Sequence, residues 1–359
     1  MNIPHPRLYQ SHENVNLNRL AEASLKAVLS VKSNPKSNII PTFVNLCSVS
    51  DYNTIVLNQH EKDRLGISFN DNDMFGYQKE SSIARYFSHE NGVIVETTSC
   101  FNELMDNTDI QSVPVKAIKL PFDFMYFHIT KKPVINGITS PIAGIYISRI
   151  NDVVTKENYK LYEDSMPLFE IGESVSILSL MYVFDGYGSP FEKRSRLSTN
   201  LFLRDEDTAD FVDLISEHIV NHANPINKSY LKELSTLSIE LLLKTILYMN
   251  TKGMRSVEVN ELSEFKKKYQ AFGKKRAEKQ ANKFPSKYDR IIVGPESIQD
   301  SSGRSNGHES KSTHWRRGHF RNQPHGEGLK ERHIIWIQPT IINAVPDETP
   351  VPKTYKMTP

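Results

Sequence analysis

At 359 residues, with 38% hydrophobic and 24% charged residues, the chain is long enough for a sizeable core and is neither fibrous nor of low complexity. Two cysteines, Cys47 and Cys100, exclude a disulfide framework and a four-thiolate zinc site, and they fit a reducing, cytoplasmic environment. The net charge of +2 conceals an asymmetry: residues 262–335 hold 17 Lys and Arg against 8 Asp and Glu, whereas the remainder carries −7, so the basic quarter is expected to face a polyanion.

The first 90 residues (1–90) are expected to form a helical and irregular region. Apolar residues at helical spacing between positions 16 and 31 predict an amphipathic helix. The opening residues lack the charged-then-apolar pattern of a signal peptide. The most apolar run, residues 239–249, is interrupted by Glu240 and Lys244. We therefore expect neither export nor a membrane span, and a protein that acts in the cytoplasm.

Residues 91–250 are predicted to form an α+β body. Runs at 92–99, 122–130 and 142–150 are rich in β-branched and aromatic residues, which favour strands. An antiparallel sheet with packed helices and a basic C-terminal module is the simplest fold for these patterns. His128, inside the second run, is expected to be a packed histidine and not a catalyst.

Three segments of the body are interpreted as helices. Residues 172–188 are one, ended by an Asp-Gly pair. Residues 205–225 are another, because three acidic residues in the first turn suit a helix N-terminus. Residues 228–250 are apolar nearly all round, which predicts a central core helix.

Residues 251–345 are expected to form a basic C-terminal module. Within it, the segment 262–284 is basic and poor in apolar residues, which predicts an exposed helix or linker. Residues 287–294 predict a strand, and residues 332–342 predict a last strand broken by a proline. The Pro-rich tail at 346–359 is expected to be disordered.

One stretch concentrates residues able to carry chemistry. Between 313 and 328, the sequence THWRRGHFRNQPHGEG holds three Arg, three His, one Trp and one Phe. A metal site would use His314, His319 and His325, with His333 as a further candidate ligand, because imidazole is a common zinc ligand. The arginines beside them, the lack of a nearby Cys or Asp and a spacing unlike zinc modules argue against it. We expect no metal and no other cofactor.

Two kinds of RNA chemistry remain open for this stretch. In a metal-independent endoribonuclease, His314 and His319 would transfer protons while two arginines stabilise the developing charge on the phosphate. In a binding surface, Arg side chains would hold phosphates and aromatic rings would stack on unpaired bases. The residues predicted to contact nucleic acid are His314, Trp315, Arg316, Arg317, His319, Phe320 and Arg321. Binding requires less geometry than cleavage, so we favour a protein that is not an enzyme in its own right.

A structural interpretation of the same residues is the third alternative. Trp315 and Phe320 would then anchor the fold, and the arginines would pair with carboxylates of the acidic body. The chain would be an interaction protein without RNA contact. No P-loop, GxGxxG or GxSxG motif offers a different chemistry.

The C-terminal stretch resembles a known family. HWRRGHF, a Gly-containing turn and IIWIQPTIIN are similar to the C-terminal signature of the second-described type V-A anti-CRISPR family. The match falls on His314, Arg316, Arg317, His319, Trp336, Pro339 and Asn343. KLPFDFMYFHI, at 119–129, is similar to a Leu-Pro and aromatic strand in the same family.

The resemblance implies a function that composition alone does not indicate. Members of that family are carried by phages, plasmids and other mobile elements. They lower the level of a CRISPR effector nuclease by recognising its nascent N-terminal peptide and provoking loss of its mRNA. The resemblance therefore implies an accessory protein that binds a target polypeptide, on the ribosome, and acts on RNA or the translation machinery.

Overall fold

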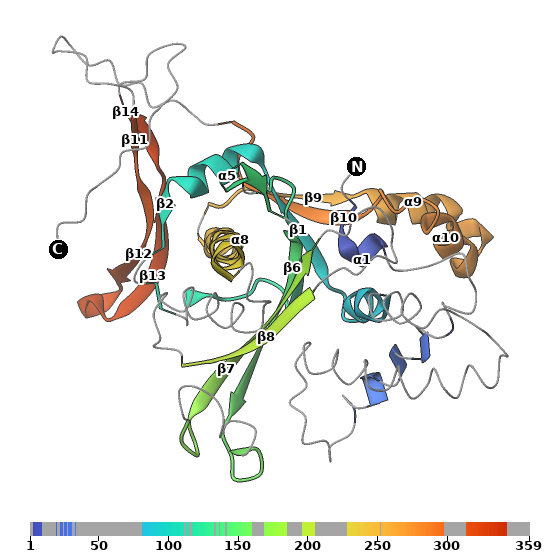
Figure 1. Ribbon diagram of the computed structural model, residues 1–359, viewed down its shortest axis with the longest axis horizontal. Coiled ribbons are helices and arrows are strands. Elements are labelled where there is room, and N and C mark those ends of the chain that lie inside the picture. The colour runs from blue at the N-terminus through green and yellow to red at the C-terminus, as the bar shows by residue number, and fades with distance from the viewer. Residues whose placement is uncertain are drawn as a thin grey trace.

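The fold is α+β, as predicted, and is built on a seven-stranded sheet (Figure 1). The computed structural model describes residues 3–8, 19, 22–23, 25–26, 28–30, 33, 81–110, 113–114, 117–132, 134–135, 137–140, 142–159, 169–184, 196–204, 228–251, 253–297 and 314–342. The predicted helix at 205–225 and the tail at 346–359 lie outside these residues.

The large sheet has the strand order β8-β7-β6-β3-β1-β10-β9. Its strands are β1 (Val93–Thr97), β3 (Phe124–His128), β6 (Ile142–Val153), β7 (Ser174–Phe184), β8 (Arg196–Leu203), β9 (Ser256–Asn260) and β10 (Asp289–Val293). The three strand runs predicted for the body correspond to β1, β3 and β6, and the prediction at 287–294 corresponds to β10. β9 and β10 thus extend a sheet whose other strands all precede residue 251.

The sheet is antiparallel except at β1, which pairs in parallel with both β3 and β10. The helix α5 (Ser99–Asp106) explains the pairing with β3, because parallel neighbours need a crossover and α5 supplies one. Thr98 caps this helix by accepting a hydrogen bond from the N–H of Phe101 at 3.1 Å. The sheet is therefore mixed, where the sequence patterns favoured a purely antiparallel one.

The prediction of a helix at residues 172–188 is wrong. Residues 174–184 form β7, which pairs with β6 on one side and β8 on the other. The run is apolar on both sides of the strand, because both faces of the sheet are covered there. A short apolar run buried on two faces does not distinguish strand from helix by periodicity.

The helix α8 (Lys228–Met249) confirms the prediction of a central core helix. Its buried residues face in all directions, and Figure 1 shows it end-on between the large sheet and the C-terminal strands. The residues of α8 in the main core are Ile239, Leu242, Leu243, Ile246, Leu247, Tyr248 and Met249. Lys244 is the cation among them: its Nζ lies 2.7 Å from Glu240 Oε1 and donates to the carbonyl of Met105 at 2.7 Å, which ties α8 to α5.

The opposite face of the sheet is covered by N-terminal residues. A helix over residues 81–89 and helical residues between 19 and 30 pack there against Tyr126 and Tyr146. The short helix α1 (His5–Leu8) joins them, with His5 Nδ1 and the Tyr146 hydroxyl hydrogen-bonded at 2.7 Å. Both faces of the central strands are therefore dry.

The C-terminal strands form two small sheets beside α8. They are β11 (His314–Arg316) with β14 (Thr340–Ile342), and β12 (Gly318–His325) between β13 (Glu331–Ile337) and β2 (Thr108–Asp109). The predicted last strand is thus two strands separated at Gln338 and Pro339. The remaining elements are the small hairpin β4 (Val134–Ile135) with β5 (Ile138–Thr139), the helices α9 (Glu261–Tyr269), η3 (Gln270–Phe272) and α10 (Lys274–Ala281), and the turn η4 (Glu327–Leu329).

The helices α9 and α10 confirm the prediction of exposed helix at 262–284. They stand at one end of the molecule, beyond β9 and β10 (Figure 1). None of the described helices combines the length and apolarity needed to cross a membrane.

Shortening one buried side chain of α8 tests the central position of this helix. Leu243→Ala is expected to lower the free energy of unfolding by about 2–5 kcal/mol, because Leu243 is fully buried and the sheet cannot close the cavity. Leu237→Ala, on the same helix but 39% exposed, is the matched control and should change it by less than about 0.5 kcal/mol. Chemical denaturation followed by circular dichroism measures both. Equal effects would contradict a helix enclosed between two layers.

Candidate functional site

The segment rich in arginine and histidine, residues 313–328, which we call the Arg/His stretch, contains two consecutive strands. Residues 314–316 form β11, where Arg316 pairs with Thr340, and residues from 318 onward form β12. His314 and Trp315 belong to β11, but their side chains lie outside the described part of the structure. Asn343 also lies outside it. The stretch is therefore sheet, which its polar composition did not indicate.

Gly318, the first residue of β12 and the residue that follows Arg316 and Arg317, is enclosed by neighbouring atoms, most of them backbone. Its N–H donates to the carbonyl of Asn107, at the end of α5, at 2.9 Å. A Cβ at this position would lie 2.5 Å from the carbonyl oxygen of Ile337 and 2.5 Å from Cδ of Pro339. Gly318 and Pro339 therefore allow β12 to approach α5 and β13 closely, which is a packing role.

β12 directs alternate side chains to opposite faces, as strands do. Phe320 points inward, is 4% exposed and belongs to the main core beside Trp336, its partner on β13. The nucleic-acid contact predicted for Phe320 does not fit this position, because a buried ring cannot stack on a base. The structural interpretation suits Phe320 and Trp336.

The other face of β12 is polar and exposed. His319 and Arg321 lie there, and Arg316 and Arg317 are exposed just before the strand. Within the described residues these three arginines make no ion pair, and Arg321 donates instead to Gln323 Oε1. Arg317 and its neighbours are therefore available to an anionic ligand and do not pair with carboxylates of the described body.

Two further histidines meet at the far end of the hairpin. The rings of His325 and His333 lie 4.3 Å apart and nearly perpendicular, and His325 Nε2 lies 3.2 Å from Glu331 Oε2. Among residues with described side chains, no group of three or more His, Cys, Asp or Glu is arranged to hold a metal ion. The pair is an edge-to-face contact across the hairpin, supported by one exposed carboxylate.

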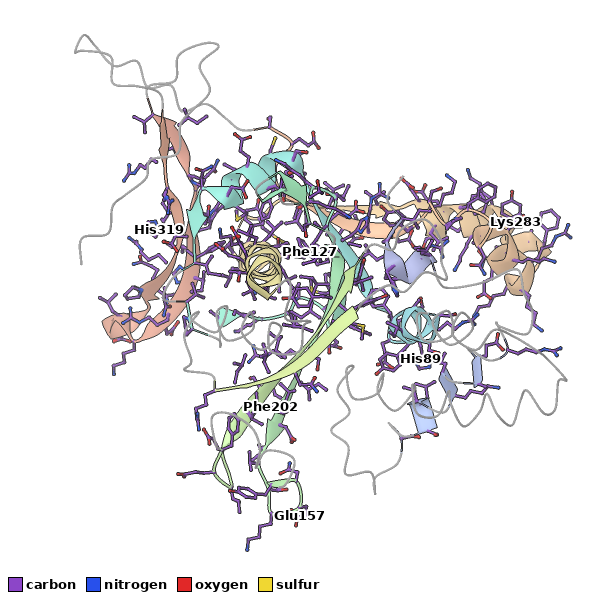
Figure 2. All side chains as sticks on the ribbon, viewed as in Figure 1. His89, Phe127, Glu157, Phe202, Lys283 and His319 are labelled. Carbon is purple, nitrogen blue, oxygen red and sulfur yellow. The ribbon has the colours of Figure 1, made fainter. Side chains whose placement is uncertain are left out.

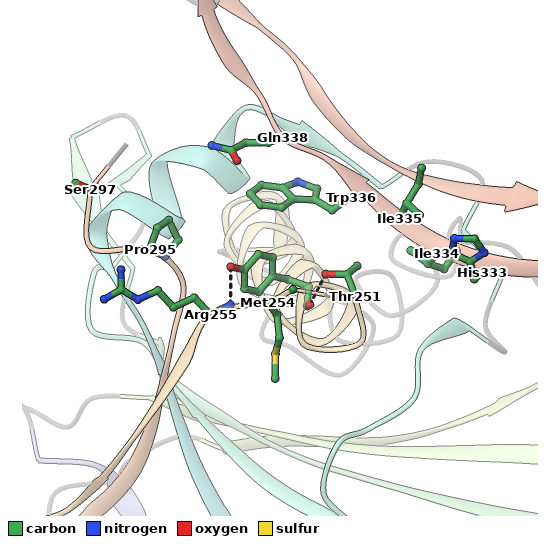
Figure 3. A pocket seen from close by; sticks show the side chains of 12 residues that line it. Thr251, Met254, Arg255, Pro295, Ser297, His333, Ile334, Ile335, Trp336 and Gln338 are labelled. Carbon is green, nitrogen blue, oxygen red and sulfur yellow. Dashed lines mark hydrogen bonds between the residues drawn. The ribbon is translucent and has the colours of Figure 1, made fainter. Parts of the chain in front are cut away.

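A cavity of 540 Å³ lies between β13, the end of α8 and the chain entering β9; we call it the β13 cavity (Figure 3). Trp336 and Tyr248 form one wall, with ring centroids 5.1 Å apart in edge-to-face contact. Its other lining residues include Thr251, Met254, Arg255, Pro295, Ile335 and Gln338. The cavity is thus part apolar and part polar, as ligand sites commonly are.

The walls of the β13 cavity are held rigidly. The Tyr248 hydroxyl accepts a hydrogen bond from the N–H of Arg255 at 3.0 Å, and its ring packs on Phe101 at 4.9 Å. The indole N–H of Trp336 points to Thr108 Oγ1 at 3.4 Å. Met254 and Arg255, by contrast, are exposed at the rim. A ligand would meet a preformed aromatic wall and two adaptable side chains.

A second hollow, of 470 Å³, lies along the same strand. It is lined by Asn250, Asn322 and Arg332, among others, and shares His333 and Ile334 with the β13 cavity. β13 is the end strand of its sheet in the described structure. An end strand leaves backbone N–H and C=O groups unpaired, so β13 offers hydrogen bonds between two hollows.

A buried polar network joins β1, β3 and β10 on the opposite face of the sheet. The Tyr288 hydroxyl donates to Glu96 Oε1 at 2.6 Å, and Arg290 Nε lies 3.2 Å from Glu96 Oε2. Burial, together with Glu96, raises the pKa of Tyr288 above its usual range, so the hydroxyl remains a donor. His128, 1% exposed, lies 4.0 Å from Glu96. These contacts tie the parallel strands together, and they make His128 a packed residue.

Sequence reasoning missed the β13 cavity and the Glu96 network. The signal for Glu96 was one carboxylate within an otherwise apolar strand run, GVIVETTS. The signal for the cavity is weaker, because Tyr248, Met254 and Trp336 are far apart in the sequence and resemble ordinary core residues. The predicted residues Arg316, Arg317, His319 and Arg321 lie near one another in sequence but do not line either hollow.

One comparison with known proteins, a family model, matches more than half of the chain. Residues 97–344 match the anti-CRISPR type V subtype A2 family, described as AcrVA2-like, and this span includes every lining residue of both hollows. A solved structure titled "Crystal structure of AcrVA2" shares 15% identity, with 90% of this chain and 93% of that chain covered and a TM-score of 0.40. No curated protein matches the chain.

Adding one methyl group at Gly318 tests the packing of the Arg/His strands. Gly318→Ala is expected to lower the free energy of unfolding by about 1–3 kcal/mol, because the new Cβ would overlap the Ile337 carbonyl and Pro339. His319→Ala, the adjacent exposed position, should change it by less than about 0.5 kcal/mol. Denaturant titration measures the free energy of unfolding of both variants. An unchanged value for Gly318→Ala would contradict the close approach of β12 and β13.

Proposed function

The chain belongs to the anti-CRISPR type V subtype A2 family, and on this premise we propose that it is a mobile-element accessory protein that lowers the level of a target protein. It binds a segment of the target polypeptide, on the ribosome, in the β13 cavity. It then acts through residues 251–345 to lower the mRNA of that target. The binding step involves no bond-making chemistry by this chain.

The observation that carries the proposal is the position of β13 as an end strand beside the cavity. An extended peptide can add to such an edge through main-chain hydrogen bonds, while pockets beside the strand accept alternate side chains. A nascent N-terminal segment is extended and unfolded as it leaves the ribosome, so its backbone is available for pairing.

The lining of the β13 cavity suggests which side chains would enter. Trp336 and Tyr248 offer an aromatic wall, and Met254 adapts to different apolar shapes. Arg255 stands at the rim, with its guanidinium 2.8 Å from Glu296 Oε1, and both side chains are more than half exposed. An apolar residue flanked by a polar one is the pattern that this site would accept.

The RNA step is proposed for the exposed face at the start of β12. Arg316, Arg317 and Arg321 have no ion pairs among the described residues, and guanidinium groups bind phosphate oxygens in bidentate fashion. His319 lies on the same outward face as Arg321. This surface is separate from the cavity, so one protein can hold a peptide and contact RNA at the same time.

Occupying the cavity with a longer, charged side chain tests peptide binding. Met254→Arg is expected to reduce capture of a ribosome-bound N-terminal segment of a type V-A effector nuclease about tenfold or more, because the arginine fills the apolar space. Met254 is 37% exposed, so the fold should survive. The measurement is a pull-down of stalled in vitro translation complexes.

Val134→Arg, at a 62% exposed position on β4, is the matched control and should leave capture unchanged. If Met254→Arg captures the segment as well as the parent protein, the β13 cavity is not the peptide site. If the parent protein captures no specific nascent segment, polypeptide binding itself is refuted.

Neutralising the exposed arginines tests the RNA step. The double variant Arg316→Ala with Arg317→Ala is expected to abolish the loss of a reporter mRNA that carries the target segment, while capture of the nascent peptide persists. The physical reason is the removal of two phosphate-binding groups that are not needed for the fold. Quantifying reporter mRNA in cells, with pull-down in parallel, separates the two steps.

If the double variant still lowers the reporter mRNA and still captures the nascent peptide, these two arginines have no part in the mechanism. Direct cleavage of labelled RNA by the purified protein in EDTA, lost in His319→Ala, would replace the proposal with the endoribonuclease alternative.

A further inference from the structure

The helices α9 and α10 form a compact unit at one end of the molecule. Together with η3 and the turn that follows, through Lys287, we call this unit the basic hairpin (residues 261–287). It extends from the end of β9 and returns into β10, so it projects beyond the large sheet (Figure 1). Neither hollow beside β13 involves it.

The basic hairpin carries a dense positive charge. Between residues 261 and 287 it holds nine Lys and Arg against three Glu. The cations are Lys266, Lys267, Lys268, Lys274, Lys275, Arg276, Lys279, Lys283 and Lys287. None of them forms an ion pair with a described residue. Their mutual repulsion destabilises the folded unit, and binding of a polyanion would relieve it.

This charge is presented on a rigid frame. Asp289 caps the start of α9 by accepting hydrogen bonds from the N–H groups of Leu262 and Ser263 at 2.9 and 3.0 Å. Arg7, from the start of the chain, donates to the carbonyls of Lys287 and Ala281 at 3.1 and 3.3 Å. Both ends of the unit are thereby fixed, so its cations are held in place before any ligand arrives.

Aromatic rings lie among the cations. Phe265 packs against Tyr269 and Phe284 with centroids 5.1 and 5.2 Å apart, which forms the small core of the hairpin. Phe272 is 61% exposed at the tip, with the Arg276 guanidinium 5.1 Å from its ring centroid, and Phe284 is 43% exposed. Exposed rings beside cations provide stacking surfaces next to phosphate-binding groups.

We propose that the basic hairpin is a docking surface for single-stranded RNA. Its lysines contact the phosphate backbone, and Phe272 and Phe284 stack on unpaired bases. A membrane surface is a less suitable partner for the basic hairpin, because most apolar side chains of this unit pack against one another. The two exposed rings that remain do not form the continuous apolar face that an interfacial helix inserts.

This surface is distinct from the start of β12. Figure 2 labels Lys283, in the basic hairpin, and His319, on β12, toward opposite ends of the long axis of the molecule. The inference rests on the proposed RNA role of residues 251–345 and assigns that role a second surface. It does not rest on the β13 cavity or on the Arg316 and Arg317 surface, and separate variants test each of them.

The test measures binding of a fluorescent 20-nucleotide RNA of mixed, unstructured sequence by anisotropy, from about 50 to 200 mM salt. The triple variant Lys267→Gln, Lys268→Gln and Lys275→Gln removes three exposed charges. Affinity at the low-salt end should fall about tenfold or more, and the slope of log affinity against log salt should become shallower by about two. Circular dichroism verifies that the helices persist.

The matched control removes three exposed lysines elsewhere: Lys119→Gln, Lys131→Gln and Lys156→Gln. It has the same change in net charge and should leave affinity within about twofold, because long-range charge effects are screened at these salt concentrations. If the two triple variants lose affinity equally, binding depends on overall charge and the proposal is overturned.

Base stacking is tested separately with Phe272→Ala, which should weaken RNA binding about fivefold or more. Leu329→Ala, at 62% exposure on η4, is the apolar control and should have no effect. An unchanged affinity in Phe272→Ala would overturn the stacking role. Binding to vesicles of anionic phospholipid, or to the matching single-stranded DNA, that exceeds binding to the RNA would overturn RNA as the partner.

Discussion

The fold depends on enclosing α8. A helix that is apolar nearly all round must be covered on every side, and the seven-stranded sheet can cover only one of them. α5 covers a second side, and the C-terminal strands complete the enclosure with Phe320, Trp336 and Ile341. The core therefore requires residues from the C-terminal strands, although the sequence around Phe320 is polar and rich in arginine. The inward half of that stretch is structural for this reason, and only the outward half is available to a ligand.

The same enclosure creates the β13 cavity. β12 approaches α5 closely at Gly318 and enters the main core with Phe320, whereas β13 borders a cavity beside the chain that passes from α8 to β9. Trp336 reaches across to Tyr248 and closes one side. The proposed peptide site beside an end strand and the proposed RNA-contacting surface on the outward face would thus both follow from one packing requirement. The basic hairpin, fixed by Asp289 and Arg7, adds a third surface that needs no part of it.

Much of the body could be predicted from the sequence, because β3 and β6 are rich in β-branched and aromatic residues and α8 is long and apolar. β7 could not, since a run buried on both faces has no period of two. The family could be inferred from the C-terminal motif, and the match over residues 97–344 confirms it, whereas the roles of the motif residues stay predictions. Composition does not distinguish Phe320 from an exposed ring, because its burial depends on α8, seventy residues away. Whether Trp315 is buried or exposed cannot be read from composition either, and its side chain lies outside the described part of the structure.

The parallel pairing of β1 has a consequence for biosynthesis. Val95 pairs with Phe127 on one side and with Ile291 on the other, so its second partner is synthesised long after the first. At about 5–20 residues per second, the chain between these two partners takes roughly 8 to 33 s to appear. During that interval one edge of the central strand, with Glu96 on it, has no strand to pair with. The emerging protein therefore passes through a stage in which its own sheet is open to other extended chains, and its yield should depend on how quickly translation reaches β10.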